Sequence, residues 1–347
     1  MPRFVCGLVV GKFSPLHHGH EYVIRHALDQ CREVVVISYS SPEFPGCEAI
    51  HRERWLRLLF PQVRSVVLDQ SRLAALLTES TASIRLPTND APDDDHRDFV
   101  ALLCRHVLRI DVDAVFTSES YGDGFAARMT HHRRSPEGRS PVRHVMVDER
   151  RSAVPISGMA IRTDLHAHRH WLSPAVYATF VRRVCLLGGE STGKSVLAEA
   201  LAGALSTRHV SEYGRELWKQ KGGRLDFDDM LRIARTQIER EDEAAGFSNR
   251  ILICDSSPLT TLFYSHSLFD RADPALEVLA SRPYDLHVLC LPDFPFVQDG
   301  TRADEAFRQR GHEWYLDQFE RRGIPFVTAD GPVEARVAGL MTRALEP

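Results

Sequence analysis

Lysine is rare in this chain, and two of its four lysines lie in short glycine-containing segments that directly follow apolar runs. Lys12 belongs to "GKFSPLHHGH" at 11–20, and Lys194 belongs to "GGESTGKS" at 188–195. A tight turn needs glycine and proline, but it does not need lysine or histidine. The basic side chains therefore serve another purpose, and the binding of anionic phosphate groups is the chemistry that they indicate.

The segment 188–195 fits the P-loop pattern G-x-x-x-x-G-K-[ST] at every position. Its glycines allow backbone N–H groups to surround phosphate oxygens, and the helix expected after it adds the positive end of its dipole. Lys194 would then reach the β- and γ-phosphates of ATP, and the Ser195 hydroxyl would be a ligand of Mg²⁺. The predicted ATP-binding residues are Gly188, Gly189, Glu190, Ser191, Thr192, Gly193, Lys194 and Ser195.

The segment 11–20 reads G-x-F-x-P-x-H-x-G-H and ends in two histidines at the expected beginning of a helix. Because His17 and His20 are three residues apart, they face the same way and can bind nucleotide phosphates together with the helix dipole. Nucleotidyl transfer needs an aligned attacking phosphate and donors where charge grows on the α-phosphate, and it needs no covalent intermediate. The predicted residues are Lys12, His17 and His20 for catalysis, and Gly11, Phe13 and Gly19 for nucleotide binding.

A third segment, "ISGMAIR" at 156–162, follows the fifth predicted strand and opens a helix. Ser157 is suited to cap that helix, and Arg162 can project toward a polyphosphate. A Ser-Gly pair before a helix is common, so the segment gains its meaning from its place after the strand. We add Ser157 to the predicted nucleotide-binding residues and Arg162 to the predicted catalytic residues.

The elements that position these segments alternate between apolar, β-branched runs and amphipathic segments. That alternation is typical of parallel sheets covered by helices on both faces. We predict two doubly wound α/β domains, a Rossmann-like domain at 1–180 and a P-loop kinase-like domain at 181–347. Two polar stretches, 92–98 and 130–141, are predicted to be loops. The predicted strands are 4–10, 33–40, 65–70, 113–119, 143–149, 181–189, 208–214, 250–257, 286–292 and 325–330.

Composition narrows the class of protein. The net charge of −4 argues against nucleic-acid binding as the main task, because such proteins need a basic surface. The seven cysteines are scattered and form no C-x-x-C pair, which is typical of reduced thiols in a cytosolic protein. No apolar run reaches the length of a membrane span. We expect a cytoplasmic protein with no membrane partner.

Together these motifs resemble a known family. The first half is similar to the H-x-G-H nucleotidyltransferases, whose second signature is I-S-x-T-x-x-R, and the whole chain resembles the NadR-type bifunctional proteins. The resemblance implies that 181–347 is a ribosylnicotinamide kinase, which makes nicotinamide mononucleotide from nicotinamide riboside and ATP. It implies that 1–180 is a nicotinamide mononucleotide adenylyltransferase, which joins that product to AMP from a second ATP and gives NAD and pyrophosphate. The matching segments are 11–20, 117–122, 156–162, 186–195, 211–216 and 297–302.

Two acids of the second half follow predicted strands, where open α/β sheets bind ligands. By analogy with nucleoside kinases, Glu212 in "SEYGRE" is predicted as the base, and Asp255 in "ILICDSS" as the acid near Mg²⁺ and Lys194. The sequence leaves an exchange of these two roles open. A structural ion pair between Glu212 and Arg215 is the alternative.

The stretch "TRADEAFRQR" at 301–310 lies between the last two predicted strands, where a mobile lid with arginines over the phosphates would be found. Arg302 fits the family pattern "DGTR" and is the predicted phosphate contact. Arg308 and Arg310 are further candidates.

The chain departs from the family at three points. Met159 replaces the threonine of I-S-x-T-x-x-R, which predicts weaker adenylyl transfer. Related adenylyltransferases stack the nicotinamide on an aromatic ring, often tryptophan, whereas the stretch 88–99 offers His96 and Phe99. The helix-turn-helix repressor domain of some members has no counterpart among the three residues before the first predicted strand, so we expect no DNA-binding role.

Several alternatives therefore stay open. The acceptor is either the nicotinamide compound or another riboside or phosphate-bearing molecule. A nucleotide-sensing regulator with a weak adenylyltransferase domain is the alternative of a different class. One active and one degenerate domain is a third, and a homo-oligomer is compatible with the sequence.

Overall fold

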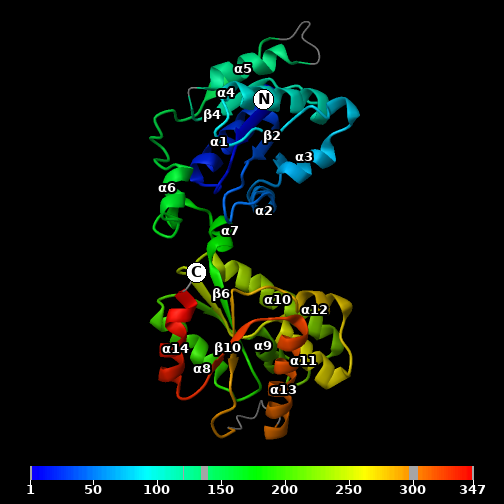
Figure 1. Cartoon of the computed structure of the whole chain (residues 1–347), viewed down its shortest axis with the longest axis vertical. Coiled ribbons are helices and arrows are strands. Elements are labelled where there is room, and N and C mark those ends of the chain that lie inside the picture. Colours follow the sequence, from blue (N-terminus) through cyan, green and yellow to red (C-terminus); the bar gives the residue numbers. More distant parts are fainter. Residues whose placement is uncertain (1, 120, 134–139, 297–303, 346–347) are drawn as a thin grey trace. The chain divides into compact units, whose positions relative to one another are not determined.

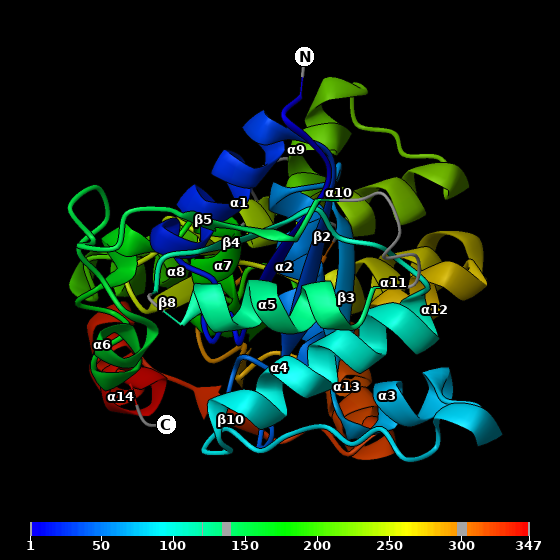
Figure 2. The same cartoon turned by 90° about the horizontal axis from the view of Figure 1, so that it is seen from above.

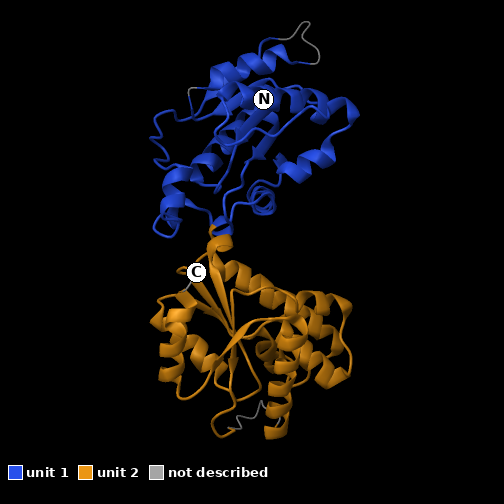
Figure 3. Ribbon diagram, viewed as in Figure 1, with its two compact units in different colours: residues 1–176 blue, residues 177–347 orange. Residues whose placement is uncertain are grey.

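The computed structural model describes residues 2–119, 121–133, 140–296 and 304–345. The chain divides into two compact units, Met1–Val176 and Tyr177–Pro347 (Figure 3). Each unit is built on its own five-stranded parallel sheet with helices around it (Figure 1). The predicted fold class, two doubly wound α/β domains, is thus confirmed. No helix within the described ranges is long and apolar enough to cross a membrane.

The sheet of unit 1 has the strand order β3-β2-β1-β4-β5, and all neighbouring strands are parallel. Because the order reverses between β1 and β4, the crevice at the carboxyl ends of these strands is where such a sheet binds ligands. The strands are β1 (Phe4–Gly11), β2 (Cys31–Tyr39), β3 (Arg64–Leu68), β4 (Ala114–Thr117) and β5 (Arg143–Met146).

Helices cover both faces of this sheet. Leu8, Val35 and Ile37 point to the face that α4 and α5 cover, and Figure 2 shows these two helices side by side. Helix α1 packs against β1 and β2 on the other face. The helices of unit 1 are α1 (His18–Gln30), α2 (Ala49–Leu59), α3 (Gln70–Leu76), α4 (Asp93–Leu102), α5 (Gly122–His131), α6 (Gly158–Thr163) and α7 (Pro174–Tyr177), with a π-helical turn at Leu103–Leu108.

The predicted loop at 92–98 is wrong, because this polar stretch forms the beginning of α4. Three aspartates in its first turn complement the positive end of the helix dipole. Arg97 then pairs with Asp93 (3.2 Å) and Asp94 (2.9 Å) along the helix. Phe99 anchors the helix in the core. Helix α5 likewise takes in residues 130 and 131 of the second predicted loop.

The sheet of unit 2 has the strand order β10-β9-β6-β8-β7, again with parallel neighbours. Its strands are β6 (Arg182–Leu187), β7 (Arg208–Val210), β8 (Ile251–Cys254), β9 (Leu286–Cys290) and β10 (Phe326–Ala329). Its helices are α8 (Lys194–Ala204), α9 (Tyr213–Gln220), α10 (Phe227–Ala245), α11 (Pro258–Phe269), α12 (Pro274–Leu279), α13 (Glu305–Arg322) and α14 (Val333–Leu345).

Two apolar cores hold unit 2 together, one on each face of its sheet. Leu187 and Leu289 pack with residues of α9 to α13, and Leu186 and Val288 pack with residues of α8 and α14. Successive strand residues thus point to opposite faces, and both faces are dry. This burial explains why the central strands of unit 2 are mostly apolar and could be located in the sequence, whereas the edge strand β7 reads Arg-His-Val and is mostly exposed.

A fully buried arginine, Arg52 of α2, holds the loop that follows β2. Its Nη1 donates to the Ser38 hydroxyl (2.7 Å), and its Nε donates to the Cys47 carbonyl (2.9 Å). Its Nη2 donates to the Glu43 carboxylate (2.5 Å) and the Leu68 carbonyl (3.2 Å). The charge is paired and its donors are distributed over four partners, which is the condition for burying an arginine.

We expect Arg52→Met to lower the free energy of unfolding of unit 1 by about 3–5 kcal/mol, because it leaves buried acceptors unpaired. Hydrogen exchange followed by mass spectrometry on peptides of β2, α2 and β3 measures the loss. Arg57→Met, at an exposed position of the same helix, is the control and should change the value by no more than about 0.5 kcal/mol. Equal protection in the two variants would contradict the assignment.

Candidate functional site

A cavity of about 460 Å³ opens at the carboxyl ends of β1 and β4 in unit 1. Residues of the segments 11–20, 117–119 and 157–162 line it. These are the three motif regions that the sequence analysis identified in the first half of the chain. They lie together at the reversal of strand order, where doubly wound sheets bind nucleotides.

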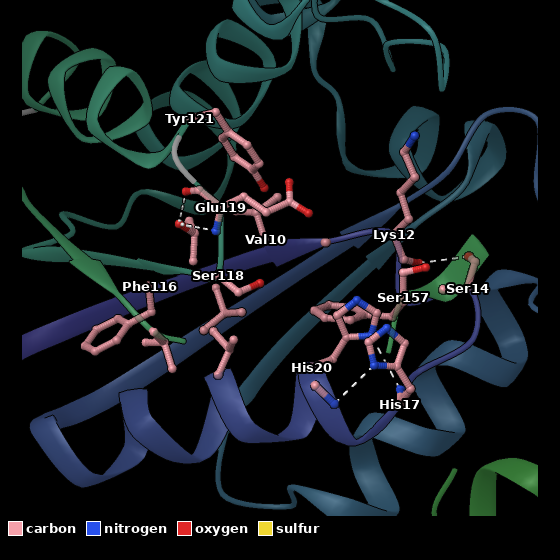
Figure 4. Close-up of a pocket in the computed structure, with 18 of the residues that line it drawn as sticks. Val10, Lys12, Ser14, His17, His20, Phe116, Ser118, Glu119, Tyr121 and Ser157 are labelled. Atoms are coloured by element: carbon pink, nitrogen blue, oxygen red, sulfur yellow. Dashed lines mark hydrogen bonds between the residues drawn. The ribbon is translucent and has the colours of Figure 1, made fainter. Parts of the chain in front are cut away.

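His17 and His20, at the beginning of α1, cap this helix from within the cavity (Figure 4). Nδ1 of His17 accepts a hydrogen bond from the Gly19 N–H (3.1 Å), and Nδ1 of His20 accepts one from the His17 N–H (3.4 Å). The two rings stack with their centroids 3.7 Å apart. Because a neutral imidazole carries one proton, two accepting Nδ1 atoms assign that proton to Nε2 in each ring. Each ring therefore keeps one N–H group, and that of His20 is hydrogen-bonded to the Pro15 backbone, a neutral partner that an anionic phosphate can displace.

Both rings are neutral at physiological pH. Burial lowers the pKa of His17 to about 4, and the positive charges of Arg151 and Arg162 act in the same direction. Burial also lowers the pKa of His20 well below its ordinary value, with His17 and Arg151 contributing. The histidines thus offer neutral N–H donors to a phosphate, and the positive charge of the cavity comes from lysine and arginine.

Lys12 and Arg162 carry that positive charge, and both line the cavity. Lys12 Nζ donates to the Asn89 carbonyl (2.9 Å), and burial together with the nearby Arg162 lowers its pKa. Arg162 donates to the Ser14 carbonyl, and its guanidinium carbon lies 4.1 Å from the centroid of the Phe44 ring. Both cations are therefore held at the cavity wall by neutral protein groups, which an anionic ligand can replace.

Helix α6 begins as predicted. Ser157 is its N-cap, and its hydroxyl accepts a hydrogen bond from the Ala160 N–H (3.2 Å). Met159 lines the cavity and is 73% exposed. The replacement of the family's threonine therefore leaves the cap intact and exchanges a hydroxyl for a thioether at the rim.

The sequence analysis named His96 as an aromatic candidate but missed Arg151 and Tyr39 in the cavity wall. Arg151, in the loop after β5, lines the cavity and pairs with Glu119 (3.1 Å). His96 of α4 lies with its Nδ1 2.9 Å from the Tyr39 hydroxyl, and the two rings stack at 5.7 Å. These residues carry no motif, since Arg151 is one of many arginines and Tyr39 reads as a strand residue. They give the cavity an aromatic wall without a tryptophan.

In unit 2 the P-loop joins β6 to α8, and close packing explains its glycines. Gly188 has a φ of 141°, and a Cβ there would lie 2.7 Å from the Cys290 carbonyl oxygen. A Cβ at Gly189 would collide with the Arg308 carbonyl oxygen. Gly193, with a φ of 79°, is the N-cap of α8 and has no side chain that could cap the helix. This arrangement leaves the helix N-terminus to an anion.

Lys194 and Arg336 brace the P-loop. Lys194 Nζ donates to the carbonyls of Gly188 and Gly189, at 2.9 Å each. Arg336 of α14 is 4% exposed and donates its Nη1 proton to the Thr192 carbonyl (2.8 Å). The sequence analysis missed Arg336, because it lies far along the chain in a helix without a motif.

The remaining side chains of the P-loop differ in their burial and in their hydrogen-bond partners. Glu190 accepts a hydrogen bond from the Tyr264 hydroxyl of α11 (2.9 Å). The buried Thr192 donates its hydroxyl proton to the Gly189 carbonyl (2.9 Å), and Ser191 is also buried. Ser195, the predicted metal ligand, is exposed in the first turn of α8. Its hydroxyl is therefore accessible to a bound ion.

Glu212 lies at the end of the loop between β7 and α9, within reach of several charges. Its Oε2 is 3.6 Å from Arg215 Nη2, so the ion pair named as the alternative is present. Burial raises the pKa of Glu212, and the charges of Asp255 and Glu190 add to this, whereas Lys194 and Arg215 oppose it. The carboxylate is thus beside the P-loop lysine as well as beside Arg215, and the ion pair does not remove it from the site.

Asp255 follows β8 and is 3% exposed. Its backbone N–H donates to the Val210 carbonyl (2.9 Å), which fixes the residue beside the end of β7. Among the described residues, its Oδ1 atom is buried and has no hydrogen-bond partner. A buried carboxylate oxygen in this situation requires a donor or a cation from a ligand.

The predicted arginine lid is only partly testable. Arg302 lies outside the described residues. Arg308 belongs to α13, where it is buried and donates to the Phe294 carbonyl (2.9 Å) and the Glu305 carboxylate (2.6 Å). Its carbonyl oxygen lies against Gly189, so Arg308 is next to the P-loop, and its role over the phosphates stays a prediction.

For the histidine pair we expect both side chains to be neutral Nε2–H tautomers at pH 7, with His17 titrating near pH 4. Because the folded pKa lies below that of the unfolded chain, unit 1 should lose stability as the pH falls from about 6.5 toward 4. Two-dimensional ¹⁵N–¹H spectra of the imidazoles measure both points. His26, on the same helix but outside the cavity lining, is the reference. Nδ1–H signals from His17 and His20 would contradict the capping geometry.

Comparison with known proteins places these two sites in context. The family model of the AAA domain matches residues 183–336. The chain is 27% identical over 348 residues to the trifunctional NAD biosynthesis/regulator protein NadR of Escherichia coli (strain K12), covering 93% of this chain and 78% of that protein. The NadR of Salmonella typhimurium (strain LT2) is also 27% identical over 358 residues, covering 98% of this chain and 82% of that protein.

Solved structures agree in fold. A NadR protein in complex with NR matches with a TM-score of 0.66 and 19% identity, over all of this chain and 97% of that one. A NadR protein in complex with NAD and AMP-PNP matches with a TM-score of 0.65, over 98% of its length. The resemblance drawn from the motifs thus extends over both units, and this chain is similar to NadR proteins over nearly its whole length.

Proposed function

We propose that this protein is a bifunctional enzyme of NAD biosynthesis. Unit 2 phosphorylates nicotinamide riboside with ATP, and unit 1 joins the resulting mononucleotide to AMP from a second ATP. The observation that carries the proposal is the presence of two separate phosphate sites, the H-x-G-H cavity and the P-loop, in one chain that is similar to NadR proteins. The ligands NR, NAD and AMP-PNP of the solved NadR structures support it.

In the kinase reaction of unit 2, a hydroxyl of the riboside attacks the γ-phosphorus of ATP, and ADP leaves with the bridging oxygen. The P-loop and Lys194 bind the transferred phosphoryl group and stabilise the charge that develops on it. Glu212 accepts the hydroxyl proton. Burial raises the pKa of Glu212 toward neutral pH, which favours its action as a general base. Asp255 and Ser195 remain as ligands for a metal ion.

The residues present fit Mg²⁺. Asp255 offers a buried carboxylate oxygen that lacks a hydrogen-bond partner among the described residues, and Ser195 offers an exposed hydroxyl. Oxygen ligands from one carboxylate and one hydroxyl, completed by phosphate oxygens and water, are what Mg²⁺ prefers. When bound, the ion neutralises charge on the β- and γ-phosphates.

In the adenylyl transfer of unit 1, a phosphate oxygen of the mononucleotide attacks the α-phosphorus of ATP, and pyrophosphate leaves. The Nε2–H group of His17 donates a hydrogen bond to the phosphates, that of His20 does so by exchanging its Pro15 partner for a phosphate oxygen, and Lys12 and Arg162 supply positive charge. No group of the protein needs to become covalently attached. Catalysis therefore depends on alignment and on donors that burial has already freed from water.

A nucleotide-sensing role for unit 1 is the second candidate. Met159 at the cavity rim favours it, because a thioether cannot replace the hydroxyl that the family pattern has at this position. In that case unit 1 binds ATP and the mononucleotide but forms NAD slowly. Formation of NAD from nicotinamide mononucleotide and ATP, measured against the binding of both ligands, separates the two candidates.

Two single variants test the division of labour. We expect Lys194→Ala to lower riboside phosphorylation at least about 100-fold and to leave adenylyl transfer from supplied mononucleotide unchanged. His20→Ala should do the reverse. Product analysis by liquid chromatography, with ATP and Mg²⁺ and either nicotinamide riboside or the mononucleotide, measures both reactions.

Lys219→Ala on α9 and His26→Ala on α1 are the matched controls, since each removes the same type of side chain away from the phosphate sites. Both controls should retain both activities. Loss of both activities in either test variant, in a folded protein, would refute independent sites. Wild-type protein that makes neither mononucleotide nor NAD would refute the proposed function.

A second pair of variants assigns the acids of unit 2. Glu212→Gln should lower kcat about 10²- to 10⁴-fold and leave the Mg²⁺ requirement unchanged. Asp255→Asn should instead raise the Mg²⁺ concentration needed for half-maximal rate. In the wild type, the acid limb of the kcat profile should lie above the ordinary glutamate pKa of about 4.3, because burial raises the pKa of Glu212. The opposite pattern of Mg²⁺ dependence would exchange the two roles.

A further inference from the structure

The beginning of α9 has an unusual cap. The first N–H groups of a helix lack intrahelical partners, and a short polar side chain at the N-cap, such as that of Asp or Ser, ordinarily accepts a hydrogen bond from one of them. Glu212 occupies the N-cap of α9, yet among the described residues its side chain makes no capping hydrogen bond. Its carboxylate is directed to the surroundings of Lys194 and Asp255 instead.

The capping group comes from a different helix. The backbone N–H of Tyr213, the first residue of α9, donates to the Oε1 atom of Gln237 on α10 (3.0 Å). Both residues are buried, and Gln237 is 2% exposed. The neutral amide of Gln237 therefore supplies an acceptor to the N-terminus of α9. The carboxylate of Glu212 does not take part in this hydrogen bond.

The orientation of the Gln237 amide is itself fixed. Its Nε2 donates to Oε1 of Glu241, one turn further along α10 (3.3 Å). The other carboxylate oxygen of the fully buried Glu241 accepts a hydrogen bond from the Tyr284 hydroxyl (2.9 Å) and lies 3.4 Å from Arg282 Nε. Burial raises the pKa of Glu241 to about 7. While Glu241 is ionised it requires a donor and the Tyr213 N–H requires an acceptor, so the amide has one satisfactory orientation.

We propose that Gln237 is a positioning residue for the kinase reaction: it caps α9 in place of Glu212 and so leaves the Glu212 carboxylate to act in the P-loop site. This inference rests on the proposed function of unit 2, in which Glu212 is the base. Gln237 touches neither substrate in this scheme, and it acts through the backbone of Tyr213.

Other contacts between α9 and α10 do not share this role. The Arg240 guanidinium carbon lies 4.4 Å from the centroid of the Tyr213 ring, and Arg240 Nη1 pairs with Glu216 (2.6 Å). These contacts hold the side of α9 to α10, and they leave its N-terminal N–H groups untouched. Loss of general packing between the two helices is therefore distinguishable from loss of the cap.

The test replaces Gln237 by a residue of similar size without an acceptor oxygen. In Gln237→Met the Tyr213 N–H has no partner on α10, and we expect the Glu212 carboxylate to turn toward the unpaired N–H groups of the first turn of α9. We expect kcat of riboside phosphorylation to fall about 10- to 100-fold, as for a catalytic group displaced by about 1 Å. KM for ATP should change less than about threefold, because the P-loop does not depend on this cap.

The pH profile separates positioning from a merely structural effect. A carboxylate that accepts a backbone N–H hydrogen bond is stabilised in its charged form, so its pKa falls. In Gln237→Met the acid limb of kcat should therefore move to lower pH, while the plateau stays reduced. A variant that is only less stable would show a lower melting temperature with an unchanged profile.

A double variant provides rescue. In Gln237→Glu alone, two buried carboxylates face each other, and activity should fall. Gln237→Glu combined with Glu241→Gln exchanges the amide and the carboxylate, keeps the acceptor for Tyr213 and keeps the net charge. The double variant should recover kcat to within about threefold of the wild type. Glu239→Gln, at an exposed position of α10, is the control and should behave as wild type.

The outcomes are separable. Gln237→Met with wild-type kcat and an unshifted profile would overturn the positioning role, as would a double variant that stays as slow as Gln237→Glu. If Gln237→Met does not fold, the comparison of Gln237→Glu with the double variant decides in the same way. A wild type that cannot phosphorylate nicotinamide riboside would overturn both the kinase assignment and the role of Gln237. The two outcomes described above would overturn the role of Gln237 alone and leave the kinase assignment standing.

Discussion

The unpaired N–H groups at the beginning of a helix are the constraint on which both sites depend. In α1 the donors are capped by imidazole nitrogens of His17 and His20, which assigns the protons of these rings to the other nitrogen. In α8 the N-cap is Gly193, and the donors are left to a phosphate. In α9 they are capped by Gln237 from a neighbouring helix. The choice of cap thus decides which side chains are available for chemistry.

The sheets make this use of helix ends possible. In a parallel sheet each strand delivers the chain to the same edge, where the following helix begins. Strands buried on both faces are apolar throughout, so polar residues gather after them, as Asp255 does after β8 and Lys194 after β6. Buried arginines hold the loops in place by donating hydrogen bonds to backbone carbonyls, as Arg52 and Arg336 do. Arg52 and Arg336 thus serve the loops and not a ligand.

The sequence predicted the parts whose signals are local. The ten strands, the P-loop and the cap of α6 at Ser157 follow from short apolar runs and from spacing within a few residues. It failed at 92–98, because three adjacent aspartates suggest a solvated loop until Phe99 is known to anchor a helix in the core. Arg151, Arg336 and Gln237 could not be found, since their roles arise from contacts between segments far apart in the chain.

The ammonium group of Lys194 has a consequence for selectivity. It already rests on two carbonyl oxygens of its own loop, so an incoming molecule does not recruit a solvated cation but displaces dipoles of the protein. The affinity gained is then the difference in strength between a hydrogen bond from Lys194 to an anionic oxygen and one to a neutral carbonyl oxygen. An uncharged molecule of similar shape gains nothing when it replaces the two carbonyl oxygens as the partner of Lys194. The contacts of Lys194 with its own loop therefore favour anionic ligands over neutral ones.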